Sequence, residues 1–263
     1  MQVKNSVIVI TGAASGIGEA AAVALAAAGA NIVLGDINEE SLNAVKHRII
    51  TDGGNAASKV LNVTDELSVQ AFMDFAIAQY SSINVVLACA GIIRDSFLVT
   101  PDKDTGMVKK FMTTEQWQQV IDVNMTGVFL TLREAAIRMI DNKCDGVLIP
   151  LSSINKCGEL GQLNYASSKA SIALWPKILA GEFYVKGIKK IRIAAIAPGY
   201  VETPILTSIK PEILQAIIDG IPLGRLVTTT EIIATIKFII ENEAVHGTTL
   251  EVSGGIIGKG LAK

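Results

Sequence analysis

The sequence predicts one α/β domain built on a parallel sheet of seven strands. Short apolar runs rich in β-branched residues alternate with longer segments of helical periodicity, and this order is typical of strand–helix–strand units. A chain of 263 residues, of which 50% are hydrophobic and 18% charged, is also long and apolar enough for one large α/β core. We therefore expect residues 1–263 to fold as a single domain, without a linker or an internal repeat.

The chain begins with a strand, a glycine-rich loop and a helix. Residues 7–11 are a β-branched run, residues 12–18 read Gly-Ala-Ala-Ser-Gly-Ile-Gly, and an alanine-rich helix is expected from about 19 to 28. Glycines let the backbone approach a pyrophosphate, and a helix N-terminus offers free N–H groups and a partial positive charge. This context predicts a dinucleotide site at Gly12, Ser15, Gly16, Ile17 and Gly18.

A second strand over 32–36 ends in an acidic residue, Asp36. A carboxylate at this place suits the two hydroxyls of an adenosine ribose and repels a 2′-phosphate. Neither Ser15 nor Ile37 offers a cation to such a phosphate. The sequence therefore predicts that NAD(H) is preferred over NADP(H).

The alternation continues along the rest of the chain. The helix expected over 64–80 has Thr64 or Asp65 as its cap. A long helix is expected to begin at Thr113 or Thr114. The other expected elements are helices over 41–50, 164–185 and 228–241 and strands over 57–63, 146–151, 191–197 and 248–252, while residues 85–91 are expected to form the fourth strand and the start of its loop.

Tyr165 and Lys169 are spaced i, i+4, so that they lie on one face of a helix, one turn apart. An ammonium one turn away favours the phenolate and is expected to lower the phenol pKa. Ser153, at the end of the preceding strand, is within the same part of the fold and can hydrogen-bond the oxygen that the phenol protonates. The three residues form a proton-transfer device for a carbonyl or an alcohol. The alternative is a surface Tyr and Lys on an ordinary helix, and this short motif alone does not decide between them.

Composition and the remaining reactive residues exclude several classes of function. A net charge of −2 offers no general basic surface for nucleic acid or an anionic membrane. The three cysteines form neither a C-x-x-C pair nor a metal-ligand pattern, so reduced thiols and no metal site are expected. Isolated His47 and His246, without a G-x-S-x-G motif, argue against a Ser-His-Asp hydrolase. No segment suits a signal sequence or a membrane span, so we expect a soluble cytoplasmic protein.

Six motifs occur in a characteristic order: TGAASGIG at 11–18, ACAG at 88–91, DVNMTG at 122–127, the serine, YASSK at 165–169 and APGYVET at 197–203. Together they resemble the short-chain dehydrogenases/reductases, and within that family the 3-oxoacyl-(acyl-carrier-protein) reductases and related acyl-CoA reductases. The resemblance covers nearly the whole chain. It implies a doubly wound Rossmann fold, a nicotinamide cofactor and a homotetramer formed through the helices at 113–141 and 164–185.

The resemblance implies four catalytic residues, Asn124, Ser153, Tyr165 and Lys169. Asn124 lies on the apolar stripe of a helix, where a buried amide must be satisfied. It either bonds neighbouring backbone or, as the family implies, holds a water that links Lys169 to solvent, and DVNMTG favours the second role. Alignment along the strand selects Ser153, because alternate residues face opposite sides, whereas counting back from Tyr165 selects Ser152. We choose Ser153.

The resemblance also implies the cofactor contacts. Asn62 replaces the family's usual Asp, and its amide oxygen is expected to accept a hydrogen bond from the adenine amino group. Cys89 replaces the usual Asn and is interpreted as a small buried filler. Gly91 is expected to pass close to the adenosine ribose, and Thr203 to bind the nicotinamide carboxamide. The expected set is completed by Val63, Ala90, Pro198, Gly199, Val201, Tyr165 and Lys169, together with the glycine-loop residues and Asp36.

Two segments are expected near the substrate. Apolar residues on both sides of an Asp- and Gly-containing turn predict a β-hairpin over residues 97–113, where the family usually has a shorter connection. Its Lys103, Lys109 and Lys110 suit a phosphate or an acidic carrier protein, but we favour a solvated hairpin that extends a subunit contact. The apolar segment 201–222 is expected to cover the substrate.

Three functions follow from this pattern. The leading one is hydride transfer between nicotinamide and a 3-oxoacyl thioester, with acyl carrier protein as a further partner. The second is oxidation or reduction of another secondary alcohol, such as a diol, a sugar or a steroid. The third is an inactive dinucleotide sensor, which Tyr165 and Lys169 argue against.

Overall fold

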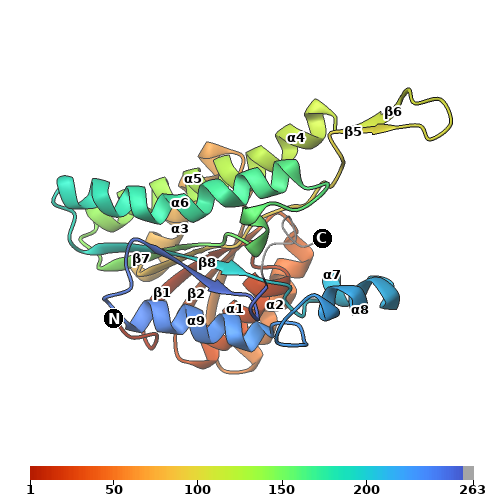
Figure 1. Cartoon of the computed structure of the whole chain (residues 1–263). Helices are drawn as coiled ribbons and strands as arrows, with labels where there is room; N and C mark the ends of the chain where they lie inside the picture. The colour runs from red at the N-terminus through yellow and green to blue at the C-terminus, as the bar shows by residue number, and fades with distance from the viewer. Residues whose placement is uncertain (257–263) are drawn as a thin grey trace.

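The computed structural model describes residues 1–256 and contains a seven-stranded parallel sheet with helices on both faces (Figure 1). The strand order is β3-β2-β1-β4-β7-β8-β9. The sheet therefore grows outward from β1 in one direction and from β4 in the other, and the predicted doubly wound fold class is confirmed. Residues 257–263 of the expected single domain lie outside the described part of the chain. The strands are β1 Val7–Thr11, β2 Asn31–Asp36, β3 Asn55–Val60, β4 Val85–Ala88, β7 Gly146–Pro150, β8 Ile191–Pro198 and β9 Thr248–Val252.

The sheet separates two hydrophobic layers, because neighbouring residues of a strand face opposite sides. In β1, Ile8 and Ile10 pack into one layer, and Val7 and Val9 pack into the other. Burial on both faces explains why these strands are continuous apolar runs. One layer is covered by α1 (Gly16–Ala27), α2 (Glu39–Thr51) and α9 (Thr229–Glu241), and the other by α3 (Glu66–Tyr80), α5 (Gly127–Asp141) and α6 (Leu163–Val185).

The third strand ends earlier than its apolar pattern suggests. β3 stops at Val60, three residues before the expected boundary at residue 63. Leu61 and Val63 are nevertheless buried, because the connection to α3 passes under that helix and needs apolar side chains. Asp65 caps α3 by accepting hydrogen bonds from the backbone N–H groups of Leu67 and Ser68.

The long helix expected after residue 113 is interrupted. It consists of α4 (Thr114–Ile121), a π-helical segment Asp122–Thr126 and α5. Thr113 and Gln116 form a capping box at its start. Gly127 allows close packing after the π segment, because a Cβ there would lie 2.8 Å from Val63 Cγ2. A π segment inside a helix is often found at a functional site.

Two projections leave the body on the same side (Figure 1). One is an antiparallel hairpin of β5 (Val99–Pro101) and β6 (Val108–Phe111), which follows β4. The other holds α7 (Pro204–Thr207) and α8 (Pro211–Asp219), which follow β8. Both therefore follow carboxyl ends of parallel strands, where α/β sheets bind ligands. No helix formed by residues 1–256 is long and apolar enough to cross a membrane.

Candidate active site

The glycine loop lies tightly against the end of β4. Gly12 has a φ of +67°, and a Cβ at this position would lie 2.7 Å from Ala90 N. A Cβ on Gly18 would lie 2.1 Å from the carbonyl oxygen of Gly12. Ser15 occupies the N-cap of α1, and its side chain makes no capping hydrogen bond. The N-terminus of α1 therefore keeps backbone N–H groups and a hydroxyl that a phosphate can accept hydrogen bonds from.

A cavity of about 210 Å³ lies beside this loop. It opens where β1 and β2 end and where the chain leaves β3. The walls are almost entirely apolar, so they suit a flat heteroaromatic ring more than a charged group. Its lining consists of Gly12, Gly35, Asp36, Ile37, Leu61, Asn62, Val63, Ala90, Ile92 and Val123.

Asp36 holds the rim of this cavity through both carboxylate oxygens. Oδ2 accepts a hydrogen bond of 3.0 Å from Ala14 N, and Oδ1 accepts one of 3.0 Å from Asn38 N. These bonds fix the carboxylate between the glycine loop and the start of α2. A carboxylate oxygen can accept further bonds, so the side chain remains able to bind two ribose hydroxyls.

Asn62 lines the cavity, but its amide oxygen is already used. Oδ1 accepts hydrogen bonds from Thr64 N at 3.0 Å and from Thr64 Oγ1 at 2.8 Å. A carbonyl oxygen has two lone pairs, so the expected bond from an adenine amino group has no free acceptor in this arrangement. The turn into α3, which begins after Asn62, explains why the oxygen points back to its own backbone.

Cys89, which we interpreted as a small buried filler, is half-buried and packs against the apolar layer that α1 covers. Its thiol is desolvated, and this burial raises its pKa to about 12, an effect that the charge of Lys169 partly opposes. The residue therefore stays a neutral thiol close to the lysine. Gly91, two residues farther along the chain, lies close to both Asn124 and Lys169: a Cβ added to it would be 3.4 Å from Asn124 Oδ1 and 3.7 Å from Lys169 Nζ.

Asn124 lies in the π segment and is fully buried. Its Oδ1 accepts a hydrogen bond of 2.8 Å from Ile92 N, and its Nδ2 donates one of 2.9 Å to Ile92 O. The side chain thus pairs with the backbone of the loop after β4. Of the two roles considered for this amide, the structure displays the backbone contact, and the water-holding role stays a prediction.

The two serines at the end of β7 have different partners. Ser153 faces Tyr165, and their hydrogen bond lowers the phenol pKa. The Ser153 hydroxyl also accepts a hydrogen bond of 3.2 Å from Asn155 N. Ser152 is buried and donates a hydrogen bond of 2.7 Å to the carbonyl oxygen of Lys169. Strand alternation therefore identified the serine that meets the tyrosine.

Tyr165 and Lys169 lie together, with Nζ 5.6 Å from the centre of the phenol ring. The pKa of Tyr165 is raised, and not lowered as expected, because burial of the phenol outweighs the hydrogen bond with Ser153, while the charge of Asp95 raises it further. Burial also lowers the pKa of Lys169 to about 8. The spacing predicted the proximity of the two groups correctly, but it could not show how strongly both are desolvated.

The loop after β8 closes the other side of the site. A Cβ on Gly199 would lie 2.8 Å from Ser253 Cα, so this loop packs directly on the turn after β9. Pro198 ends β8, and Val201 is buried in an isolated bridge with Val227. Thr203 faces the glycine loop, since its Cγ2 is 4.0 Å from the position of a Cβ added to Gly16.

A third, smaller apolar cluster lies beside Ser153. Ile154 follows the serine directly and is buried in this cluster, into which α7 and α8 send their inner faces. The segment expected to cover the substrate therefore packs apolar side chains around the residue that follows Ser153. The cluster contains Ile154, Ile221, Leu226 and Ile256, with Tyr200, Leu206, Leu214, Ile217 and Ile218 packed against it.

Comparisons with known proteins agree with this geometry. A family model described as enoyl-(acyl carrier protein) reductase matches residues 12–257. The chain belongs to the short-chain dehydrogenase/reductase family. It is 33% identical to the 3-oxoacyl-[acyl-carrier-protein] reductase FabG of Thermotoga maritima, covering 98% of this chain and 100% of the relative. It is 30% identical to the human (3R)-3-hydroxyacyl-CoA dehydrogenase, covering 97% of each chain. The crystal structure of gox2181 matches 97% of this chain and 96% of its own, with 29% identity and a TM-score of 0.84.

As a member of this family the chain is an oxidoreductase that uses a nicotinamide cofactor. The residues present fit such a group, because the glycine loop leaves no space for a Cβ at Gly12 or Gly18 and the adjacent cavity is apolar. Gly16, with a φ of +57°, and the exposed Ser15 complete the N-terminus of α1. These residues and Asp36 would hold the dinucleotide.

Sequence reasoning missed Asn164 and Asp95, which lie around Tyr165. Asn164 is fully buried, donates hydrogen bonds to Arg94 O at 3.0 Å and Gln116 O at 3.1 Å, and accepts one from Tyr165 N at 2.8 Å. Asp95 is held by Gln162 at 2.9 Å. A polar residue directly before Tyr165, at the buried start of a helix, was the one signal that could have identified Asn164.

Proposed function

We propose that this chain reduces a 3-oxoacyl thioester to the 3-hydroxyacyl thioester with NADH. The observation that carries the proposal is the position of Tyr165 between Ser153 and Lys169, with an apolar cluster that includes Ile154 next to the serine. The names of the relatives from Thermotoga maritima and human add support, because both describe enzymes of 3-oxoacyl or 3-hydroxyacyl thioesters.

In this proposal Ser153 and Tyr165 donate hydrogen bonds to the substrate carbonyl oxygen and fix its orientation. The bound nicotinamide supplies the hydride that the carbonyl carbon receives. Tyr165 donates its proton to the oxygen as negative charge develops there, and its raised pKa keeps the phenol protonated at neutral pH. Lys169, as an ammonium, stabilises the phenolate that is left, and Asn124 would order the water that returns the proton.

Lys169 retains enough basicity for this role. Its pKa of about 8 leaves most of the amine protonated at neutral pH. The Nζ donates a hydrogen bond of 2.8 Å to Leu151 O, and an ammonium has two further protons for a ribose hydroxyl and for the phenolate. The lysine therefore has enough donors for both groups.

The preference for NADH over NADPH is part of the proposal and rests on Asp36. Its two oxygens are fixed by Ala14 N and Asn38 N at the rim of the adenosine cavity. A 2′-phosphate at this place would meet a carboxylate that cannot turn away. The remaining cofactor contacts are proposed from the family resemblance and from their places in the fold. Val63 and Ala90 line the same cavity, Cys89 and Gly91 follow β4, and Pro198, Gly199, Val201 and Thr203 lie at or after the end of β8.

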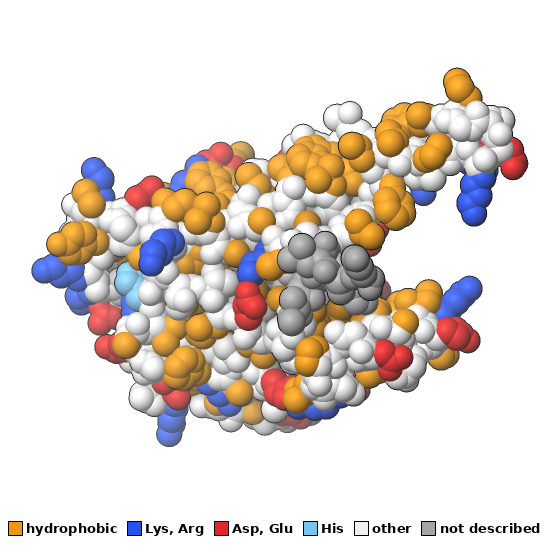
Figure 2. All heavy atoms as spheres, in the orientation of Figure 1, with side chains coloured by type: hydrophobic (Ala, Val, Ile, Leu, Met, Phe, Trp, Pro, Cys, Tyr) orange, Lys and Arg blue, Asp and Glu red, His pale blue; other side chains and the backbone are white. Residues whose placement is uncertain are grey.

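Acyl carrier protein is a proposed donor of the substrate, with acyl-CoA as the alternative thioester. The apolar cluster around Ile154 suits an acyl chain, and the space-filling view shows an open notch between the outer parts of the two projections, where a bulky carrier could approach (Figure 2). The three cysteines, Cys89, Cys144 and Cys157, are all free, and this supports a reducing, cytoplasmic setting.

The proposal includes self-association through the helices at 113–141 and 164–185, toward a homotetramer. A groove of about 440 Å³ runs between α5 and α6 and is lined mainly by apolar side chains, among them Phe129, Trp175 and Ile178. Phe129 and Ile178 are 48% and 47% exposed. An apolar surface of this kind is typical of an interface between subunits.

Initial-rate reduction of acetoacetyl-CoA with NADH, and then with NADPH, tests the proposal. Turnover that is faster with NADH supports both the substrate class and the role of Asp36. Turnover only with NADPH would contradict the cofactor preference. A folded protein that binds NADH but reduces neither acetoacetyl-CoA nor an acetoacetyl carrier protein would contradict the thioester, and diols, sugars and steroids would then be assayed.

A further inference from the structure

We infer that the β5–β6 hairpin is an arm that clasps a second copy of this chain, its apolar face packing on the C-terminal ends of that copy's α5 and α6. The inference rests on the pairing of helix layers proposed above and identifies a second contact within it. We call residues 97–112 the arm, and α5 and α6 together the helix layer.

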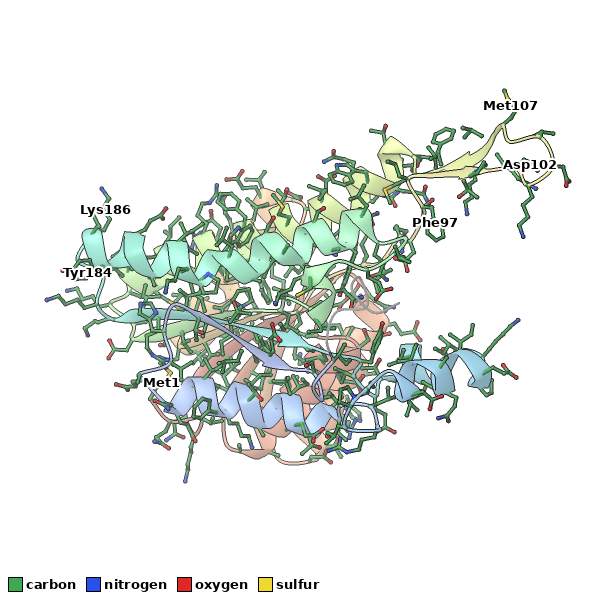
Figure 3. The ribbon with its side chains drawn as sticks, in the orientation of Figure 1. Met1, Phe97, Asp102, Met107, Tyr184 and Lys186 are labelled. Carbon is green, nitrogen blue, oxygen red and sulfur yellow. The ribbon has the colours of Figure 1, made fainter. Side chains whose placement is uncertain are left out.

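The root of the arm is fixed to the start of the helix layer. Ser96 N donates a hydrogen bond of 2.8 Å to Gly161 O, and Ser96 forms an isolated bridge with Gln162, directly before α6. Asn164 binds the carbonyl of Arg94 at 3.0 Å, two residues before the bridge. The arm therefore leaves the body in a fixed direction. Figure 3 shows Phe97 at its base and Asp102 and Met107 at its far end, beyond the helices.

The arm is amphipathic. Val99 pairs with Phe111 and Pro101 with Val108, so these four side chains lie on one face, because directly opposed residues of an antiparallel pair share a face. Thr100 pairs with Lys110 on the other face. Val99, Val108 and Phe111 are 57%, 62% and 57% exposed. One face of the hairpin is thus a row of large apolar side chains that contacts little of the described chain.

Hydrogen bonds and an ion pair hold the turn at the tip of the arm in one conformation. Asp102 Oδ1 accepts hydrogen bonds from Asp104 N at 3.1 Å and Thr105 N at 3.2 Å, and Lys109 pairs with Asp102 at 3.1 Å. A two-stranded hairpin alone is only marginally stable in water. An ordered tip combined with an uncovered apolar face indicates that a partner covers that face.

A matching apolar surface lies at the opposite end of the helix layer. Tyr184 and Val185, the last residues of α6, are 86% and 77% exposed, and Ile140, near the end of α5, is 47% exposed. Figure 3 shows Tyr184 and Lys186 at the end of the layer farthest from the arm. Within one chain the arm and this surface therefore cannot meet.

The interrupted helix α4–α5 and the helix α6 run in the same direction. Gln116 contacts Asn164, and farther along Asn124 contacts Ser168, so both helices begin beside the arm and end at the opposite side. If two copies pair through their helix layers around a twofold axis perpendicular to the helices, the layers are antiparallel. Each arm then extends over the C-terminal end of the other layer, and the same contact forms twice. Figure 2 shows apolar side chains on both the arm and the helix layer, interspersed with polar ones.

Charge on the arm argues against an acidic carrier protein as its partner. Lys109 is neutralised by Asp102, and the tip adds Asp104 to Lys103. Lys110 is left on the polar face, opposite the apolar row. The face that needs covering is apolar, and an apolar partner surface is present on the same molecule.

Cross-linking between two singly substituted chains tests the inference. In a Cys157→Ser background, which removes the exposed native thiol, Val108→Cys and Tyr184→Cys are made in separate chains with different tags, coexpressed and treated with a short bismaleimide. We expect a covalent product that contains both tags. Lys110→Cys with Tyr184→Cys, and Val108→Cys with Ile213→Cys on α8, are matched controls that should yield at least tenfold less of it.

The native mass of the unmodified chain, measured by sedimentation, distinguishes failure of the helix-layer pairing from failure of the arm contact alone. A monomer at micromolar concentration would contradict both the pairing of the helix layers and the arm. A dimer or tetramer without the Val108–Tyr184 product, or with equal products in the controls, would contradict the arm alone.

A second variant set tests the apolar row without a cross-linker. Val99→Thr, Val108→Thr and Phe111→Thr together keep strand-forming residues but remove the apolar face, and we expect self-association at least tenfold weaker. Lys110→Thr, on the opposite face, should leave it unchanged. An unchanged mass, combined with a loss of activity on an acyl carrier protein substrate but not on acetoacetyl-CoA, would overturn the inference and identify the carrier protein as the arm's partner.

Discussion

Lys169 and the end of β7 are tied by two hydrogen bonds that run in opposite directions. The Nζ of Lys169 donates to the carbonyl oxygen of Leu151 at 2.8 Å, and Ser152 Oγ donates to the carbonyl oxygen of Lys169 at 2.7 Å. Both contacts are buried. They fix α6 relative to the strand, and this fixed distance brings Tyr165 to the hydroxyl of Ser153. The two adjacent serines therefore have different roles in the structure: Ser152 joins the strand end to α6, and Ser153 faces the phenol of Tyr165.

Alanine substitutions should separate the two serines. Ser153→Ala is expected to lower kcat by about 10²-fold or more, because it removes a donor to the substrate oxygen, with little change in stability. Ser152→Ala removes a buried hydrogen bond and is expected to cost about 1 kcal/mol of unfolding free energy. Steady-state kinetics and urea unfolding of both variants check this. The reverse pattern would mean that the alignment by strand alternation was wrong.

Tyr165→Phe tests the proton donor. The substitution keeps the ring and removes only the hydroxyl, so a loss of about 10²- to 10⁴-fold in kcat is expected for reduction. NADH affinity, measured by fluorescence titration, should stay within a few-fold of the parent chain. Turnover that survives the substitution would exclude the phenol as the donor.

The buried amine of Lys169 predicts a specific dependence of stability on pH. Burial lowers its pKa from 10.5 to about 8, so between these values the unfolded chain binds a proton that the folded chain does not. Stability then rises with pH across this window, relative to a chain without the amine. The unfolding free energy of the parent minus that of Lys169→Met should increase by roughly 3 kcal/mol from pH 8 to 10.5.

Urea unfolding of both chains at several pH values measures that difference. Taking the difference removes the other groups that titrate in the same range, among them the remaining lysines. A difference that stays constant, or falls as the pH rises, would show that the amine is better solvated than its position between Leu151 and Tyr165 indicates.

The sequence was sufficient for the fold and for the residues around the glycine loop, because each depends on local rules. Apolar runs identify strands that are buried on both faces. A glycine is required at a position such as Gly18, because any Cβ there would clash with the carbonyl oxygen of Gly12. The position at which β3 ends was harder to predict. Leu61 and Val63 continue the apolar pattern beyond the strand, since they are buried without being part of the ladder.

Other features depend on three-dimensional context and leave no periodic signal. Over Asp122–Thr126 each hydrogen-bonded turn contains one residue more than in an α-helix. Over so short a segment this change does not disturb the apolar stripe enough to indicate a π-helix from the sequence. Spacing placed Lys169 near Tyr165, but the pKa of the phenol depends on burial, which the spacing does not contain. The partners of Asn124 and Asn62 likewise required the positions of loops, namely the backbone of Ile92 and of Thr64.

Asn124→Ala is expected to destabilise the fold strongly. It would leave the N–H and C=O of Ile92 without their partners in a region where the side chain is fully buried, at a cost of roughly 2–4 kcal/mol. Ser168→Ala is a comparison variant: its contact with Asn124 is long, at 3.5 Å, so its cost should reflect mainly the lost hydrogen bond of 2.7 Å to Tyr165 O and be smaller than that of Asn124→Ala. Thermal and urea unfolding measure both. If Asn124→Ala loses activity without losing stability, the water-holding role is the better account.

Asp36→Asn tests the basis of the cofactor preference. The amide keeps an acceptor oxygen for Ala14 N or Asn38 N but removes the negative charge, so the loop should hold its shape while a 2′-phosphate is no longer repelled. The ratio of kcat/KM for NADPH to that for NADH is expected to rise about tenfold, equivalent to about 1.4 kcal/mol. Asp36→Ala, which also removes both acceptors, should lower kcat/KM with both cofactors, because the glycine loop loses its anchor. A ratio that does not change in Asp36→Asn would mean that the ribose is bound away from this carboxylate, and the preference would then have to come from the apolar wall of the cavity.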